Sequence, residues 1–295
     1  MAGPDLTEPS APGTKVPSGD FGRLAFGFLT VSALSGLALV PFFSPAHALE
    51  SLERLQGGLP WGFFLRALHA FSSFGLLVTT AGHLVQVIAR RTERQLPPGA
   101  WWRSVLLLPL TFLALLSGFV LRGDAAAAEA LSVWSRIAET VPFLGPELAR
   151  LLLGVIPGDV GAISLHHAGT FTLLLWLITA EHGRRLFPDA RSLVLAGLVS
   201  AALAGAVPLP LGPPPGASPG GAARILLGPW YLLGLQGALV DLPVSAAWLG
   251  PLLFVLGLGL VRHADGRMRR LLLVLAGAWV AAWVGFTARI LLFAR

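Results

Sequence analysis

Seven long apolar stretches constrain the fold of this 295-residue chain more than any other feature. A bilayer core about 30 Å thick is crossed by about 20 helical residues. A spanning segment must also satisfy its own backbone hydrogen bonds, which favours helices. The sequence therefore predicts an all-α integral membrane protein with about seven transmembrane helices, of which the fifth and sixth are short. The stretches run over Gly22–Phe43, Trp61–Ala89, Arg103–Leu121, Leu165–Leu186, Ser192–Leu209, Ala246–Val261 and Arg270–Phe293.

The composition excludes several classes of protein and limits the ligands available for a cofactor. Charged residues make up 12% of the chain, whereas about 25% is usual in a soluble domain. This excludes an ordinary soluble enzyme, a disordered protein and a collagen-like repeat. The chain has no cysteine, so disulfides, thiolate-bound iron–sulfur clusters and covalent haem attachment are excluded. The 7 histidines are therefore the scarce residues to follow.

The segments outside the apolar stretches predict a membrane orientation. Residues 1–21 are rich in Pro, Gly and Ser and lack an apolar h-region, which indicates a disordered arm rather than a signal peptide. Lys and Arg are more frequent in loops on the side of this arm, which places the N-terminus in the cytoplasm. Two long connections, Arg122–Ser164 and the one after Gly212, contain segments expected to lie on the outer membrane surface. The aromatic residues expected at the membrane interfaces are Trp101, Trp102, Trp134, Trp230 and Tyr231.

Histidine spacing predicts which imidazoles share a helix face. His69 and His83 are 14 residues apart, which is four helical turns less about 40° and about 21 Å along the axis. His167 and His182 are 15 residues apart, which is four turns plus about 60°. His166 is 16 residues from His182 and points to about the opposite face. His167 is thus the better partner for His182, although spacing alone leaves His166 open.

The second and fourth stretches run in the same direction because one span separates them. We therefore expect His69 beside His167 near the outer side, and His83 beside His182 near the inner side. Bundle cores with inward-facing ligands are typical haem sites, and iron with two histidine ligands has no open position, so it carries electrons. An isolated histidine in a span is more often a packed polar group, and zinc favours four ligands at one point. Two matched pairs favour haem over both alternatives.

Motifs around the histidines resemble the cytochrome b/b6 family, the membrane subunit of quinol-oxidising bc and bf complexes. GFFLRALHAF at residues 62–71 is similar to the family's GWLLRSLH stretch, with Arg66 and His69 in place. Gly22 and Gly36 have the same separation in sequence as His69 and His83. They are similar to the paired glycines that make room for two haems in the family.

Further motifs extend the resemblance over nearly the whole chain after the arm. SGFVL at residues 117–121 resembles the family's TGYxL, which places Gly118 on its second glycine and Ser104 on its first. VPFLGPEL at residues 141–148 is similar to the family's IPxIGxxL. The stretches AGAVPLPLGPPPGASP and LLGPWYLLGLQ resemble the proline linker and the PEWY stretch of the small subunit that is separate in the b6 branch.

The resemblance implies a division of the chain and a set of cofactor contacts. Residues 22–190 would form a four-helix bundle holding two non-covalent b-type haems, and residues 191–295 a fused three-helix region. His69 and His167 would bind the outer haem iron, and His83 and His182 the inner one. Arg66 would pair with a propionate of the outer haem. The glycines making room for the haems would be Gly22, Gly36 and Gly118.

The sequence departs from the family at the outer quinol-oxidation site. Gly228–Tyr231 stand where the family has PEWY, so its glutamate is missing, and only Asp124 of the PWxQ stretch keeps an acidic group. Asp124 and Glu181 remain as candidate proton carriers, although a loop Asp is more often a solvated turn or cap residue. Glu181, followed by Arg184 and Arg185, would serve a quinone site, hold haem propionates or anchor the helix at the interface.

The sequence thus predicts a dihaem b-type cytochrome subunit of a membrane quinol:electron acceptor oxidoreductase in a bacterial-type inner membrane. The expected partners are lipid, a quinone, an iron–sulfur or c-type cytochrome subunit and a second copy of the chain, with no nucleic acid. Two alternatives stay open. One is an electron conduit with a degenerate outer quinol site, and the other is a haem-free scaffold or transporter subunit.

Overall fold

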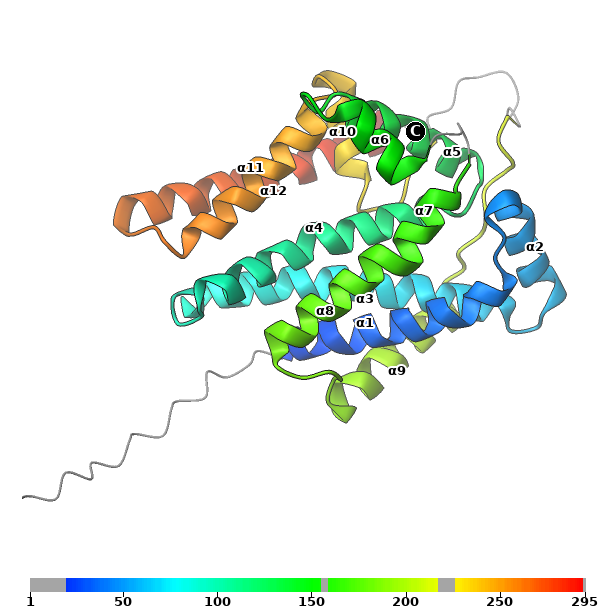
Figure 1. The fold of residues 1–295 in the computed structure, drawn as a ribbon, viewed down its shortest axis with the longest axis horizontal. Coiled ribbons are helices and arrows are strands. Elements are labelled where there is room, and N and C mark those ends of the chain that lie inside the picture. Colours follow the sequence, from blue (N-terminus) through cyan, green and yellow to red (C-terminus); the bar gives the residue numbers. More distant parts are fainter. Residues whose placement is uncertain (1–19, 155–158, 217–225, 294–295) are drawn as a thin grey trace, which may run out of the picture.

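The computed structural model describes residues 20–154, 159–216 and 226–293, and the regular structure in these ranges is helical (Figure 1). A π turn, His166–Phe171, joins two of the helices into one rod. The predicted N-terminal arm and the middle of the proline linker lie outside the described residues. The helices are α1 (Asp20–Leu39), α2 (Ala48–Gly58), α3 (Gly62–Ala89), α4 (Pro98–Val120), α5 (Ala125–Glu139), α6 (Gly145–Leu153), α7 (Gly161–Leu165), α8 (Thr172–Gly183), α9 (Ala190–Ala206), α10 (Leu233–Asp241), α11 (Ala246–Val261) and α12 (Gly266–Phe293).

Within the described ranges, five helical segments are long and apolar enough to cross a bilayer, which confirms the all-α membrane class. They are Phe21–Phe42, Gly62–Ala89, Pro98–Val120, Gly161–Gly183 and Gly266–Leu292. Helices α9 and α11 are apolar but span only 17 and 16 residues. Helix α4 begins at Pro98 rather than at the predicted Arg103, because proline is well suited to the first helical turn.

Helices α1, α3, α4 and the α7–α8 rod form a bundle in which each contacts two neighbours (Figure 1). Its interior is lined by small hydroxyl residues as well as apolar side chains. The hydroxyls of Ser32 and Ser73 lie 2.7 Å apart and join α1 to α3. Thr111 and Ser117 of α4 are fully buried and donate to carbonyls of their own helix. These bonds satisfy the buried hydroxyls without breaking the helices.

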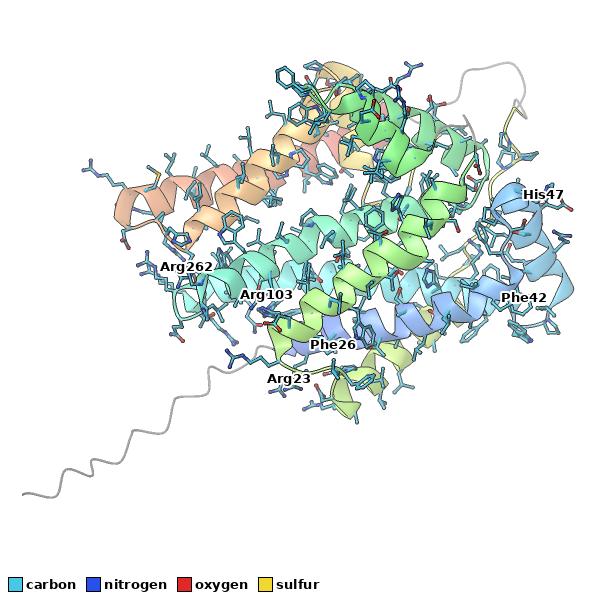
Figure 2. The ribbon with its side chains drawn as sticks, in the orientation of Figure 1. Arg23, Phe26, Phe42, His47, Arg103 and Arg262 are labelled. Atoms are coloured by element: carbon cyan, nitrogen blue, oxygen red, sulfur yellow. The ribbon has the colours of Figure 1, made fainter. Side chains whose placement is uncertain are left out.

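The two ends of the bundle are identified by the residues that lie there. Figure 2 shows Arg23, Arg103 and Arg262 at one end, which we name the inner end, and Phe42 and His47 at the other, which we name the outer end. Helices α5 and α6 lie over the outer end (Figure 1).

The three helices of residues 191–295 that were predicted to form one region lie on two sides of the bundle. Helix α9 packs on α1 and α3, whereas the hairpin of α11 and α12 contacts α4 (Figure 1). The α1–α9 contact is close, since a Cβ at Gly27 would lie 2.5 Å from the carbonyl oxygen of Ser192. In the segment Gly266–Leu292, the most apolar 18-residue window has no buried residue. This part of α12 is therefore accessible to lipid.

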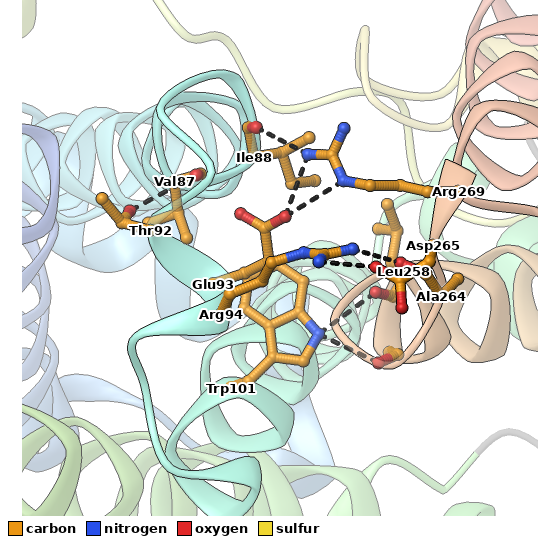
Figure 3. Close-up of polar contacts among 11 residues, drawn as sticks. Val87, Ile88, Thr92, Glu93, Arg94, Trp101, Leu258, Ala264, Asp265 and Arg269 are labelled. Atoms are coloured by element: carbon orange, nitrogen blue, oxygen red, sulfur yellow. Dashed lines mark hydrogen bonds and ion pairs between the residues drawn. The ribbon is translucent and has the colours of Figure 1, made fainter. Parts of the chain in front are cut away.

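A polar clamp joins the α3–α4 loop to the α11–α12 hairpin at the inner end (Figure 3). Glu93 is fully buried and accepts hydrogen bonds from Nε and Nη2 of Arg269 at 3.2 and 2.9 Å. Arg94 pairs with Asp265 at 2.6 Å. Arg262 donates two hydrogen bonds to a backbone carbonyl of the loop, at 2.9 and 2.7 Å. The hairpin is therefore fastened to the bundle by charged groups as well as by apolar packing.

Several aromatic residues predicted at the membrane interface lie inside the molecule instead. Trp101 is fully buried, and its indole N–H donates to two carbonyls of α11 at 3.2 and 3.0 Å. Trp134 and Tyr231 are also buried, while Trp230 is half exposed. Trp101 and Tyr231 tolerate burial because their polar tips donate to backbone carbonyls. Such acceptors come from distant helices, so the sequence alone did not reveal them.

Candidate functional site

The interior of the bundle brings the four predicted histidines together in two pairs. The ring centroids of His69 and His167 are 6.0 Å apart, and those of His83 and His182 are also 6.0 Å apart. We name these the outer pair and the inner pair. His166, the alternative that spacing left open, is half-buried, and its Nε2 lies 2.8 Å from a backbone carbonyl of α6. The geometry thus pairs His167, and not His166, with His69.

The π turn explains why two unequal histidine spacings bring both pairs of rings to the same separation. His167 lies inside the turn, and Thr172 Oγ1 donates to its carbonyl at 2.7 Å. A π turn accommodates one extra residue within a helix. The angle around the helix axis between His167 and His182 is therefore close to that between His69 and His83, although one more residue separates the first two. This mismatch of a single position was the signal in the sequence for the turn, and π turns are frequent at functional sites.

The outer pair is held by hydrogen bonds to backbone carbonyls. His69 Nδ1 donates to the carbonyl of Ser32 at 2.9 Å, and His167 Nδ1 donates to the carbonyl of Ala114 at 3.1 Å. A carbonyl can only accept, so both protons lie on Nδ1 and both Nε2 atoms keep free lone pairs. This is the arrangement that orients a metal-binding imidazole. Within the described ranges, neither Nε2 has a hydrogen-bond partner.

Glycine lets the neighbouring helices approach both rings of the outer pair. A Cβ added at Gly36 would lie 2.9 Å from Cε1 of His69, and one at Gly118 would lie 2.8 Å from Cε1 of His167. Both distances are shorter than ordinary carbon contacts, which lie near 3.5–4.0 Å. The glycines therefore leave the space that the rings occupy.

The inner pair is less firmly held. Nδ1 of His83 is buried without a hydrogen-bond partner, and both ring nitrogens of His182 lie 3.3 Å from Oγ of Ser104. Gly22 faces His83, where a Cβ would lie 3.0 Å from the ring. Ser104 takes the corresponding place opposite His182. The inner pair thus meets one glycine and one serine where the outer pair meets two glycines.

A cavity of about 340 Å³ opens beside the inner pair. Its wall contains two further buried polar atoms without a partner, Oε1 of Gln86 and Nε of Arg103. Arg103 also approaches Glu181, with 3.7 Å between Nη2 and Oε1, and Glu181 is largely exposed. Unpartnered buried polar atoms are unfavourable, so they indicate a group that completes the site. The lining cations are Arg23, Arg90, Arg103, Arg184 and Arg185.

Near the outer pair, Arg66 is buried and points to a neutral partner. The amide oxygen of Gln56, in the orientation that satisfies both groups, accepts from Nε and Nη2 of Arg66 at 2.6 and 2.8 Å. Asp124 is a helix cap, one of the roles expected for a loop Asp, but it is fully buried rather than solvated. Its Oδ1 caps α5 by accepting from the N–H of Ala127 at 3.0 Å, and its Oδ2 accepts from the N–H of Gly212 at 2.9 Å. These contacts give Asp124 a structural role.

The GPWY stretch, at the place of the family's PEWY, is held by an amide side chain. Gln236 Oε1 accepts from the N–H of Gly228 at 2.9 Å, and its Nε2 donates to the carbonyl of Leu226 at 3.0 Å. The hydroxyl of Tyr231 donates to the carbonyl of Leu115 at 3.0 Å. Burial raises the pKa of Tyr231 above its usual range, so this hydroxyl stays protonated.

The two pairs have the dimensions of a bis-imidazole metal site. A metal bound at about 2.0–2.1 Å by one nitrogen of each ring would place the ring centroids about 6 Å apart. The observed 6.0 Å separations agree with this, as do the free Nε2 atoms of the outer pair. The residues present therefore fit a planar haem bound between the rings. Their role as ligands stays a prediction.

The chain belongs to the cytochrome b/b6 family. The family model "Cytochrome b/b6/petB" matches residues 14–182, the range that contains both histidine pairs, and this confirms the resemblance inferred from the motifs. The menaquinol:cytochrome c reductase cytochrome b subunit of Geobacillus thermodenitrificans is 30% identical over 147 residues, covering 49% of this chain and 65% of that subunit.

Other similar proteins extend the comparison to the whole fold. Cytochrome b of Schizosaccharomyces octosporus is 28% identical over 137 residues, covering 46% of this chain and 35% of its own length. The chain thus matches less than two thirds of the length of either relative. A chain of a solved structure described as hyperthermophilic respiratory Complex III superposes with a TM-score of 0.63 at 15% identity, covering 93% of this chain and 91% of that one. The fold is therefore similar beyond the residues that the family model matches.

Proposed function

We propose that this protein is the dihaem b-type cytochrome subunit of a bc-type quinol-oxidising complex. It would carry electrons across the membrane between a quinone and a partner redox subunit of iron–sulfur or c-type. The observation that carries this proposal is the presence of two imidazole pairs at two levels of one bundle. Each pair has 6.0 Å between its ring centroids. A quinone substrate is supported by the relative from Geobacillus thermodenitrificans, which is named for menaquinol and cytochrome c.

Each pair is proposed to bind one haem, which supplies one-electron redox chemistry when it is bound. His69 and His167 would ligate through Nε2, because their Nδ1 atoms donate to backbone carbonyls. His83 and His182 would ligate at the inner level. The glycines opposite the rings would leave room for the macrocycles, since a Cβ there would fill the space.

The chain is proposed to cross the membrane seven times, by the five long segments together with the shorter α9 and α11. The inner end, which carries Arg23, Arg103 and Arg262 (Figure 2), would then lie on the cytoplasmic side, because the positive-inside rule places arginine there. Residues 22–190 would be the electron-carrying unit and residues 191–295 a region attached to it. A homodimer is proposed on the resemblance alone.

A second candidate function is an electron conduit whose outer quinol site does not work. It is favoured by the stretch Gly228–Tyr231, which carries no carboxylate and whose backbone is held by the neutral amide of Gln236. Turnover with quinol that persists in the presence of an outer-site inhibitor supports the conduit. Turnover that the inhibitor abolishes supports outer-site oxidation.

Substitution of one histidine from each pair tests the proposal. His69→Ala and His182→Ala are each expected to remove one haem from the reduced-minus-oxidised spectrum of the purified protein. His166→Ala is the matched control, because His166 adjoins a proposed ligand in sequence but its Nε2 bonds to a carbonyl of α6 instead of facing His69. A full two-haem spectrum in both His69→Ala and His182→Ala overturns the ligand assignment. A colourless wild-type protein favours the haem-free scaffold or transporter.

A further inference from the structure

Two arginines flank the outer pair on its outer side, one in α3 and one in the turn that follows α4. Arg66 precedes His69 by three residues in α3, and Arg122 follows Gly118 by four residues, in the turn after α4 ends at Val120. Residues three or four apart lie on the same helix face. The Arg66 side chain therefore starts from the helix face that carries His69, while Arg122 lies in the turn just beyond Gly118. Arg122 stands where the family's PWxQ stretch begins with proline.

The contacts of Arg122 leave part of its hydrogen-bonding capacity unused. Its Nη2 pairs with Asp124, and its guanidinium lies 5.1 Å from the centroid of the Phe119 ring. Its Nε is buried without a hydrogen-bond partner. Asp124 is shared, because the same carboxylate accepts from the N–H groups of Ala127 and Gly212. Arg122 is thus only partly satisfied.

The charges of this cluster do not balance. Arg122 and Asp124 are the charged groups acting on Arg66, and the hydrogen-bond partner of Arg66 is the neutral amide of Gln56. Among the described residues, the cluster therefore contains two cations and one anion. An unpaired charge in a buried place is costly. A carboxylate-bearing ligand at the edge of the outer pair would remove this cost, since guanidinium groups bind carboxylates in bidentate geometry.

We propose that Arg122 is a positioning residue for the outer haem, binding a propionate together with Arg66 and raising the midpoint potential of that haem. This inference rests on the proposed function and adds Arg122, which occupies a proline position of the family. A cation beside a redox centre favours the reduced form, because reduction lowers the positive charge at the iron. Asp124 opposes this effect by neutralising part of the charge of Arg122.

Redox titration of the purified protein, with the two haems resolved by their spectra, tests the proposal. Arg122→Gln is expected to lower the midpoint potential of the haem that His69→Ala removes and to leave the other haem unchanged. Arg122→Lys keeps the charge and is expected to preserve the potential. Both arginine variants are expected to shift the carboxylate bands of the redox difference infrared spectrum. Arg54→Gln is the matched control, because Arg54 is an exposed arginine that pairs only loosely with Glu50, at 3.8 Å.

The outcomes separate this proposal from the proposed function. A wild-type protein without two haems overturns both. Two haems with unchanged potential and unchanged carboxylate bands in Arg122→Gln overturn only the role of Arg122. If Arg122→Gln does not fold, the midpoint potential of the outer haem is measured in Asp124→Asn, and the direction of its change tests the role of Arg122. A raised potential of the outer haem supports the proposal, and an unchanged or lowered potential overturns it.

Discussion

The outer and inner pairs have the same ring separation but differ in how the protein holds them. Both rings of the outer pair donate Nδ1–H to backbone carbonyls, at 2.9 and 3.1 Å, and both face glycines. Serine hydroxyls lie near rings of both pairs, but in the inner pair Nδ1 of His83 is buried without a hydrogen-bond partner. A cavity with arginine-rich walls opens beside the inner pair.

This contrast indicates that the outer site is preorganised and the inner site is completed by its occupant. Backbone carbonyls fix ring orientation before a cofactor binds, which lowers the ordering cost of binding. We therefore expect the outer haem to be retained more tightly than the inner one. The inner end also carries the polar clamp and the start of α9, so changes there are expected to affect the inner site selectively.

Breaking the clamp is expected to have the largest effect on stability. Glu93→Leu leaves the guanidinium of Arg269 nearly buried without its carboxylate, and loss of one partner of a buried pair costs about 3–5 kcal/mol. We expect a lower thermal midpoint in detergent and earlier loss of the inner haem than of the outer haem. Glu147→Leu is the control, since Glu147 forms an exposed ion pair. Equal loss of both haems contradicts the selective effect.

Filling the outer glycine position is expected to have the next largest effect. Gly118→Ala places a Cβ 2.8 Å from the His167 ring, and overpacking of this kind costs about 1–3 kcal/mol. The outer haem is expected to be lost or spectrally shifted while the inner haem is retained. Gly197→Ala is the control, because nothing lies within 4 Å of its added Cβ. Normal haem content in Gly118→Ala argues against the glycine's role.

Removing the cap of α9 is expected to have a smaller, pH-dependent effect. Asp189 accepts hydrogen bonds from the N–H and hydroxyl of Ser192, both at 3.0 Å. The Ser192 N–H lowers the pKa of Asp189, so its contribution is present at neutral pH and is lost as the pH falls through the folded-state pKa. Asp189→Ala is expected to cost about 1 kcal/mol at neutral pH.

Asp189→Asn separates the cap from the charge, because Asn also caps helices well. Thermal midpoints measured from pH 7 down to pH 3 are expected to show a smaller acid loss for Asp189→Asn than for the wild type. Identical acid profiles for these two proteins contradict the assigned role of the carboxylate.

The serine beside the inner pair is expected to give the smallest effect. Ser104→Ala removes a hydroxyl that lies 3.3 Å from both ring nitrogens of His182 and donates to a carbonyl at 3.1 Å. One such hydrogen bond contributes about 0.5–1.5 kcal/mol. We expect a small shift of the inner haem spectrum without loss of haem. Loss of the outer haem in this variant contradicts the independence of the two levels.

The helices and the histidine pairing follow from local sequence features, which is why both could be predicted. Apolar length predicted the membrane helices, and angular spacing predicted that His69 meets His167 and that His83 meets His182. Histidine spacing in a regular α-helix does not predict the π turn. The extra residue between His167 and His182 is its signal in the sequence.

The remaining contacts could not be predicted because they join groups far apart in the chain. The carboxylate of Glu93 meets Arg269, and the indole of Trp101 meets carbonyls of α11. The cap role of Asp124 is typical of a loop Asp, but its burial is not, because Gly212 contacts its carboxylate from a distant part of the chain. Residue types in single segments do not specify such pairings. A second arginine shortly after Gly118 was visible in the sequence, but its relation to Arg66 needed the tertiary arrangement.

The haem content of the purified wild-type protein is the sharpest test of the assignment of the two histidine pairs. The paired geometry predicts two non-covalent b-type haems per chain by the pyridine haemochrome assay, falling to none when His69, His83, His167 and His182 are all replaced. A wild-type protein without haem contradicts the assignment. Two haems per chain after the fourfold substitution also contradict it.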